Sequence, residues 1–126
     1  MIEGLTFDTG ILIALERRNH RAREILEKAV RRTLRITVPT PVVVEWWRGR
    51  TDIREAILRA VRVEPLSDAL AKISGEALAA VSGATAVDAI VMASAAQRGD
   101  IVYTSDVGDL MRLARHFPSV RVLGIG

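Results

Sequence analysis

The sequence contains no cysteine, and aromatic residues make up only 4% of it. The absence of cysteine excludes disulfides and thiolate metal sites, and it fits a reducing compartment such as the cytoplasm. Long apolar runs are also missing: Pro41 to Val44 is typical, far below the ~20 residues that cross a bilayer. The stretch from Met1 to Gly4 has no basic region followed by an apolar segment, so we expect neither a signal peptide nor membrane association.

What the chain does have is enough apolar sequence for one core. Of its 126 residues 49% are hydrophobic and 26% are charged, which predicts a single folded domain over 1–126. The net charge is +3, and sixteen of the eighteen basic residues are arginine. Guanidinium groups form paired hydrogen bonds with phosphates and carboxylates. The composition therefore suits a nucleic acid or an acidic partner, although a solvated arginine-rich surface explains it equally well.

Apolar residues follow helical and strand spacing in alternation along the whole chain. This alternation predicts an α/β fold in which a mostly parallel sheet of about five strands carries helices on both faces. At the third helix we expect Thr40 as the N-cap, Pro41 in the first turn and Gly49 as the stop. The expected strands cover 5–7, 34–38, 61–63, 101–104 and 120–123, and the expected helices cover about 9–18, 21–32, 41–48, 52–60, 68–81, 86–98 and 106–116.

Five acidic residues fall where these strands end or these helices begin. Asp8 follows the first strand, Glu45 lies in the helix after the second, and Asp88 lies in the first turn of the helix that leads into the fourth. Asp106 follows the fourth strand, and Asp109 lies one helical turn later on the same face. Functional groups of open α/β sheets gather beyond the carboxyl ends of the strands, so we expect several of these acids to converge.

Clustered carboxylates repel one another and raise each other's pKa unless a cation neutralises them. Oxygen ligands suit Mg²⁺ or Mn²⁺, which can activate a water for attack on a phosphodiester. This is the chemical argument for a nuclease. Each acid also has a purely structural interpretation: Asp8 can cap its helix, and the pairs Thr85–Asp88 and Asp106–Asp109 fit capping boxes. Glu45 can be an ordinary exposed helix residue.

Four segments together resemble the PIN-domain family and, within it, the VapC-type toxins. The resemblance spans nearly the whole chain and lies in the order that the family has. The segments are Leu5-Thr6-Phe7-Asp8-Thr9-Gly10, Val38-Pro39-Thr40-Pro41-Val42-Val43-Val44-Glu45, Thr85-Ala86-Val87-Asp88-Ala89-Ile90 and Tyr103-Thr104-Ser105-Asp106-Val107-Gly108-Asp109-Leu110.

The resemblance implies a PIN fold, Mg²⁺ or Mn²⁺ as cofactor, and endoribonuclease activity on RNA. It also implies a cognate antitoxin partner and a homodimer, or a hetero-oligomer of toxin and antitoxin. The metal-binding catalytic acids would be Asp8, Glu45, Asp88 and Asp106. Asp109 would be an auxiliary acid, and Thr104 would orient groups through its hydroxyl. The sequence departs from the pattern at Phe7, where leucine is more usual, and at Gly10, where serine or asparagine is common.

Other functions remain as alternatives. A phosphoacceptor domain fits poorly, because Gly10 stands where phosphatases of that kind need a second aspartate, and neither Lys28 nor Lys72 follows a late strand. A PIN fold kept only to bind protein or RNA, and a nuclease acting on DNA, both stay open. In the pair Trp46–Trp47 we expect one ring in the core, while the other serves as an antitoxin anchor or a base-stacking platform.

Overall fold

A computed structural model describes residues 4–126. Residues 1–3, on which the expectation about a signal peptide partly depends, lie outside the described residues. The five strands form one parallel sheet in the order β3-β2-β1-β4-β5, which confirms the fold class expected from the sequence. The strands are β1 (Leu5–Phe7), β2 (Ile36–Pro39), β3 (Arg62–Glu64), β4 (Ile101–Thr104) and β5 (Arg121–Gly124).

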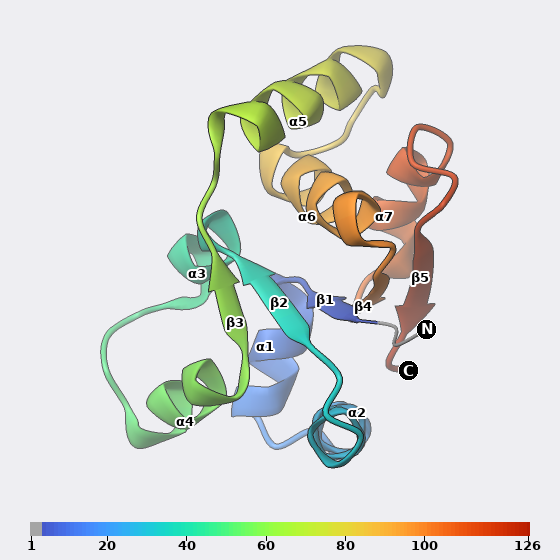
Figure 1. The fold of residues 1–126 in the computed structure, drawn as a ribbon. Helices are drawn as coiled ribbons and strands as arrows, with labels where there is room; N and C mark the ends of the chain where they lie inside the picture. Colours follow the sequence, from blue (N-terminus) through green and yellow to red (C-terminus); the bar gives the residue numbers. More distant parts are fainter. Residues whose placement is uncertain (1–3) are drawn as a thin grey trace.

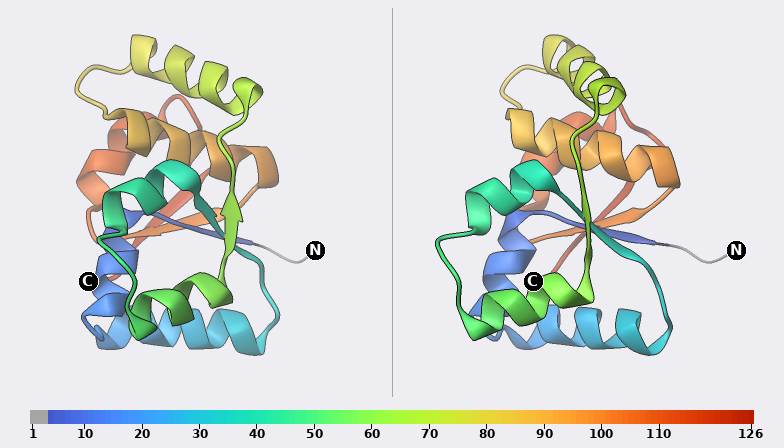
Figure 2. Two further views of the ribbon diagram at one scale, coloured as in Figure 1. Left: turned by 90° about the vertical axis from the view of Figure 1, so that its left-hand side faces the viewer. Right: turned by 60° about the vertical axis from the view of Figure 1, so that its left-hand side comes forward.

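Helices cover both faces of this sheet (Figures 1 and 2). On one face lie α1, α2 and α4, and on the other lie α6 and α7, with α5 packed on the outside of α6. The short helix α3 contacts both α1 and α6 at one edge of the sheet. The helices are α1 (Thr9–Glu16), α2 (His20–Arg31), α3 (Thr40–Trp46), α4 (Asp52–Ala60), α5 (Asp68–Ala80), α6 (Ala86–Arg98) and α7 (Val107–Ala114).

Local sequence signals explain where most of these helices begin and end. Side-chain oxygens of Asp8, Asn19, Thr51, Ser67 and Thr85 each accept a hydrogen bond from a backbone N–H in the first turn of the following helix. At its other end α6 stops at a glycine with φ of +71°, the left-handed conformation that favours this residue. The apolar faces then pack into one core, to which all seven helices and the strands β1, β2 and β4 contribute buried residues.

The third helix differs from its expected boundaries. Pro39 occupies the N-cap position, and Thr40 is the first helical residue. The Thr40 hydroxyl instead accepts a hydrogen bond at 3.2 Å from the backbone N–H of Leu66, beyond the end of β3. A tertiary contact has therefore replaced the expected cap. The helix also ends at Trp46, before it reaches Gly49.

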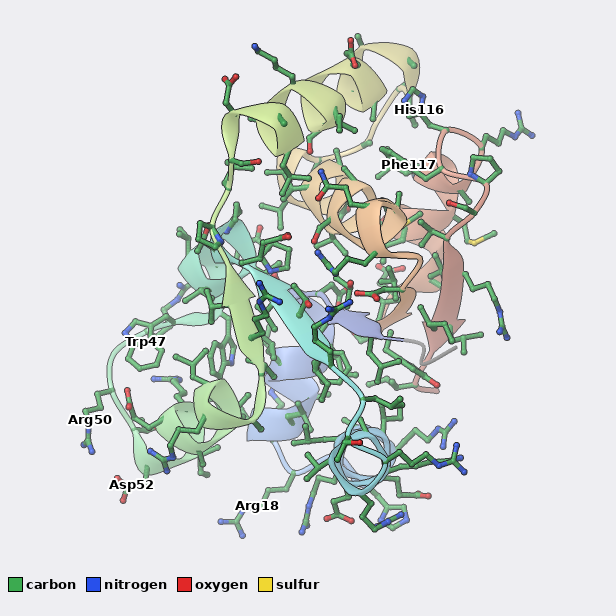
Figure 3. The ribbon with its side chains drawn as sticks, in the orientation of Figure 1. Arg18, Trp47, Arg50, Asp52, His116 and Phe117 are labelled. Carbon is green, nitrogen blue, oxygen red and sulfur yellow. The ribbon has the colours of Figure 1, made fainter. Side chains whose placement is uncertain are left out.

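The two tryptophans divide as the sequence predicted. Trp46 is 2% exposed, and its indole N–H donates to Glu16 at 2.9 Å, so this ring is part of the core. Trp47 is half-buried and lies toward the outer rim beside the connection to α4 (Figure 3). Among residues 4–126, no helix is long and apolar enough to cross a membrane.

Candidate active site

The order in which strands are added to the sheet reverses between β1 and β4. The strands β2 and β3 lie on one side of β1, and β4 and β5 lie on the other, so this point is the switch point of the sheet. Asp8 follows β1, and its carboxylate accepts the Thr104 hydroxyl at 2.5 Å across this point. The same Thr104 oxygen accepts the backbone N–H of Asp106 at 2.9 Å. Thr104 therefore fixes the ends of β1 and β4 relative to each other, with both aspartates beside it.

Asp8 also serves as a helix cap, as the structural interpretation expected. Its second carboxylate oxygen accepts the N–H of Ile11 at 3.1 Å in the first turn of α1. Burial raises the pKa of Asp8 from 3.8 to about 6, and the negative charge of Asp88 adds to this rise. The hydrogen bonds from Thr104 and from the α1 backbone oppose it. Capping and a functional role are thus compatible in one side chain.

Glu45 reaches the same edge from α3. Its carboxylate accepts the hydroxyl of Thr9 at 2.6 Å, which holds it next to the residue that follows Asp8. Thr9 was not among the residues predicted for the site. Its only signal in the sequence is its place after Asp8, because its partner lies 36 positions further along the chain.

Asp88, in the first turn of α6, is close enough to other acids for their charges to act on it. Its pKa is raised first by burial and then by the negative charges of Asp109, Glu45 and Asp106, against a lowering hydrogen bond from the Thr85 hydroxyl. Together with the charge of Asp88 at Asp8, these interactions place all five predicted carboxylates in one neighbourhood. We call the set of Asp8, Glu45, Asp88, Asp106 and Asp109 the acidic edge.

Asp106 and Asp109 lie at the start of α7 and are exposed. Asp106 occupies the N-cap position of α7, yet its side chain makes no capping hydrogen bond within the described chain. The capping box expected for this pair therefore does not form, and both carboxylates face solvent. At the other pair, Thr85 does accept the N–H of Asp88 at 3.1 Å, as a cap should.

The acidic edge is an open arrangement. Within residues 4–126, no three carboxylate or imidazole side chains are close enough together to hold a metal ion. No carboxylate of the acidic edge forms an ion pair with another described residue. Because like charges repel, this set of oxygen ligands is one that a divalent cation would draw together.

Two grooves flank the acidic edge on either side of α1. One of about 240 Å³ is lined by Glu45, Arg17, Arg48 and Arg54 among others. The other, of about 560 Å³, is lined by Gly10, Ser105 and again Arg17. A Cβ atom at Gly10 would meet the Ser105 hydroxyl oxygen, so the serine occupies the space that a larger residue 10 would need. The departure at Gly10 is thus matched by a polar group from the loop after β4.

The sequence model of the PIN domain matches residues 5–115. The chain therefore belongs to the PIN-domain family, whose members are in general nucleases that use divalent metals. No curated protein matches the chain in sequence.

Solved structures with the same fold include the following three. A toxin–antitoxin complex from Klebsiella pneumoniae has a TM-score of 0.73 at 20% identity, covering 93% of this chain and 95% of that chain. VapBC2 from Rickettsia felis bound to a DNA fragment from its promoter gives 0.74 at 13% identity, with 98% of both chains covered. FitAcB from Neisseria gonorrhoeae has a TM-score of 0.67 at 19% identity, covering 96% of this chain and 97% of that chain.

Proposed function

We propose that this protein is a divalent-metal-dependent endoribonuclease and the toxin of a toxin–antitoxin pair, folded as one PIN domain over 1–126. One observation carries the proposal. Thr104 ties Asp8 to the start of α7 across the switch point of a parallel sheet, with Asp88 among the other acids and no cation to pair with them in the described chain. Structural carboxylates are normally paired, so unpaired ones at this position favour metal-assisted chemistry.

Asp8, Glu45, Asp88 and Asp106 would hold Mg²⁺ or Mn²⁺, with Asp109 as an auxiliary acid. The donor set fits such an ion because it is all oxygen, and the repulsion that raises the pKa of Asp88 would be relieved by binding. When bound, the metal supplies charge neutralisation and a water of lowered pKa. The chain's own part is positional: Thr104 orients the Asp8 carboxylate, and Thr9 orients that of Glu45.

The grooves beside α1 support an RNA substrate. Arg17 lines both of them, and Arg48 lines the one that contains Glu45. Neither arginine has an ion-pair partner among residues 4–126. Arg48 donates to the backbone carbonyls of Val44 and Trp47, and the positive charge of both arginines can still act on phosphates. A single strand passing over the acidic edge would then lie against basic side chains on the Glu45 side of the scissile bond.

The partner belongs to the proposal as well. The structural relatives from Klebsiella pneumoniae and Rickettsia felis are described as a toxin–antitoxin complex and as VapBC2 on promoter DNA. By this likeness we propose a cognate antitoxin for this chain, a homodimer or a toxin–antitoxin hetero-oligomer, and action in the cytoplasm, where RNA is the target. A PIN fold that only binds protein or RNA is the second candidate, and metal-dependent turnover separates the two.

The test is cleavage of a mixed structured RNA pool by the purified chain with Mg²⁺, with Mn²⁺ and with EDTA. We expect cleavage that needs the metal and that falls by roughly 10³-fold or more in Asp8→Asn. The matched control is Asp52→Asn, because Asp52 has a side chain that is 98% exposed and points away from the sheet on α4 (Figure 3).

The control should cleave like the parent protein. Equal cleavage by Asp8→Asn would refute the assigned site. A folded parent protein, free of antitoxin, that binds RNA and never cleaves it would favour the binding module. Cleavage of single-stranded DNA in place of RNA would keep the site and change the substrate.

A further inference from the structure

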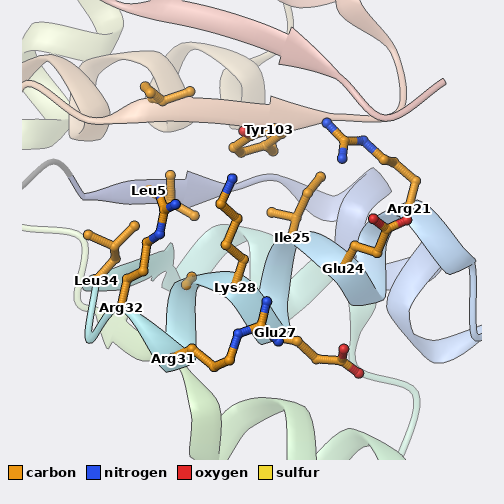
Figure 4. Close-up of a pocket in the computed structure, with 12 residues that line it drawn as sticks. Leu5, Arg21, Glu24, Ile25, Glu27, Lys28, Arg31, Arg32, Leu34 and Tyr103 are labelled. Atoms are coloured by element: carbon orange, nitrogen blue, oxygen red, sulfur yellow. The ribbon is translucent and has the colours of Figure 1, made fainter.

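A groove of about 310 Å³ runs between α2 and the sheet, and the proposed nuclease does not use it (Figure 4). Its floor is apolar, with Leu5 from β1, Ile101 and Tyr103 from β4, Ile25 from α2 and Leu34 after α2. Side chains alternate between the faces of a strand, so Leu5 and Tyr103 point to the face opposite the one that carries Asp8 and Thr104. The groove is therefore separate from the acidic edge.

The rim of this groove is strongly basic. Arg21, Lys28 and Arg31 line it from α2 and Arg32 from the C-cap of that helix, and none of them has a carboxylate partner among residues 4–126. In Figure 4, Lys28 from α2 and Arg32 from the end of that helix extend toward the strands across the apolar floor.

Two glutamates also line the rim, but each has a partner on α2. Glu27 forms an ion pair with Arg23 at 4.0 Å, and Glu24 contacts His20 at 2.9 Å, which is an ion pair only when the imidazole is protonated. With four cationic side chains against these two carboxylates, the rim carries an excess of positive charge above an apolar surface.

We propose that this groove binds an acidic segment of a partner protein, one that places aliphatic side chains on the floor and carboxylates against Lys28 and Arg32. Charge complementarity selects this occupant, because guanidinium and ammonium groups pair with carboxylates while the aliphatic floor takes methyl groups. The floor offers one aromatic ring, Tyr103, which is too little for a run of stacked bases. The inference stands apart from the nuclease activity, since it is read out by binding alone.

The experiment uses three fluorescein-labelled ten-residue peptides and the full chain. One peptide alternates leucine and glutamate, the second leucine and lysine, and the third serine and glutamate. Anisotropy measures affinity at low and at high salt, and amide shifts in an ¹⁵N spectrum locate the site. We expect the Leu/Glu peptide to bind most tightly, at least tenfold tighter than either control peptide, and to shift Ile25, Leu34 and Tyr103.

The variant Lys28→Glu/Arg32→Glu should weaken binding of the Leu/Glu peptide by roughly tenfold. The matched control is Arg59→Glu/Arg115→Glu, which makes the same change in net charge at two exposed arginines outside the groove. Far-ultraviolet circular dichroism confirms that both variants are folded.

Several outcomes overturn the proposal. Equal losses in both variants would mean unspecific charge attraction. No binding of the Leu/Glu peptide at millimolar concentration, or equal binding of the Ser/Glu peptide, would mean that the groove is not a docking site. Self-association that only Lys28→Glu/Arg32→Glu abolishes would make a second copy of this chain the occupant. Displacement of the peptide by oligouridine, with oligouridine binding lost in the same variant, would make RNA the occupant.

Discussion

Two groups of carboxylates adjoin α6 or the helices that contact it, and only one of these groups contains a cation among the described residues. Beneath α6, Arg98 donates to Asp100 at 2.9 Å and to Glu64 at 2.8 Å. It also donates to the hydroxyls of Thr6 and Ser94, so nearly every polar group there has a partner. We call these five residues the Arg98 network. The acidic edge has more carboxylates and no such cation among the described residues.

The difference separates structural charge from functional charge. A buried carboxylate that serves the fold is matched by a fixed cation, because an unmatched charge in the interior costs several kcal/mol. A carboxylate that binds a metal ion must have no fixed cation beside it in the metal-free protein. The free-energy cost of keeping such a carboxylate charged appears as the raised pKa of Asp8 and Asp88. The comparison predicts opposite responses to mutation in the two regions.

The largest effect should come from the Arg98 network. Arg98→Ala leaves the fully buried carboxylate of Asp100 and the half-buried one of Glu64 without a cation. We expect the free energy of unfolding to fall by about 3–5 kcal/mol, measured by urea denaturation. Arg59→Ala, an exposed arginine on α4, is the control and should change stability by less than about 0.5 kcal/mol. A small loss for Arg98→Ala would end the distinction drawn between the two regions.

At the acidic edge, stability without metal should depend on pH in the direction set by Asp8. Its pKa in the folded state, about 6, lies above the ordinary value of 3.8. Protonation of Asp8 therefore adds to the free energy of unfolding in full below pH 3.8, and this contribution is lost as the pH rises through about 6. Its upper limit is about 3 kcal/mol. Asp88 acts in the same direction.

Urea denaturation in EDTA across pH 4 to 7 measures this dependence. Asp8→Asn should flatten it and be more stable than the parent protein at pH 7. Added Mg²⁺ should stabilise the parent protein more at pH 7 than at pH 5, because metal binding needs the charged carboxylates. An unchanged pH dependence in Asp8→Asn would assign it to other groups.

Substitution of Thr104 should have an intermediate effect on RNA cleavage, because Thr104 only positions Asp8 and Asp106. Thr104→Val keeps the shape but removes the donor to Asp8 and the acceptor for the Asp106 N–H. We expect RNA cleavage and Mg²⁺ affinity to fall by roughly 10–100-fold, as for other groups that orient metal ligands. Thr104→Ser restores the hydroxyl and should recover most of both. A merely structural role would instead lower stability in the valine variant and leave Mg²⁺ affinity unchanged.

The smallest effect concerns substrate binding beside the acidic edge. Arg17→Ala and Arg48→Ala should each raise KM for RNA several-fold, up to about tenfold, with little change in kcat. Each should also reduce the salt dependence of RNA binding by about one phosphate contact. Arg59→Ala again serves as the control. Equal KM values for all three variants would show that RNA does not bind in the two grooves beside α1.

Much of this protein could be predicted from the sequence because the signals involved are local. Apolar spacing located every strand and helix to within a few residues, and the alternation of the two implied a parallel sheet. Asp8 and Asp106 follow strands, and Asp88 and Asp109 lie in first turns of helices, as expected. Glu45 was expected in the first turns of its helix but lies in the last turn of the short helix α3. One buried ring in the pair Trp46–Trp47 was also expected, since adjacent helix residues cannot both face inward, and the structure shows that the buried one is Trp46.

Only the tertiary structure decided which distant residues meet. The contacts of Thr9 with Glu45, Thr40 with Leu66, and Arg98 with Glu64 join positions 26 to 36 residues apart. None has a local pattern, because each depends on the order of strands in the sheet and on the packing of α3 and α6. The sequence by itself determined the elements and the acids. The packing determined which carboxylates have a cation, since charge pairing is a property of neighbours in space.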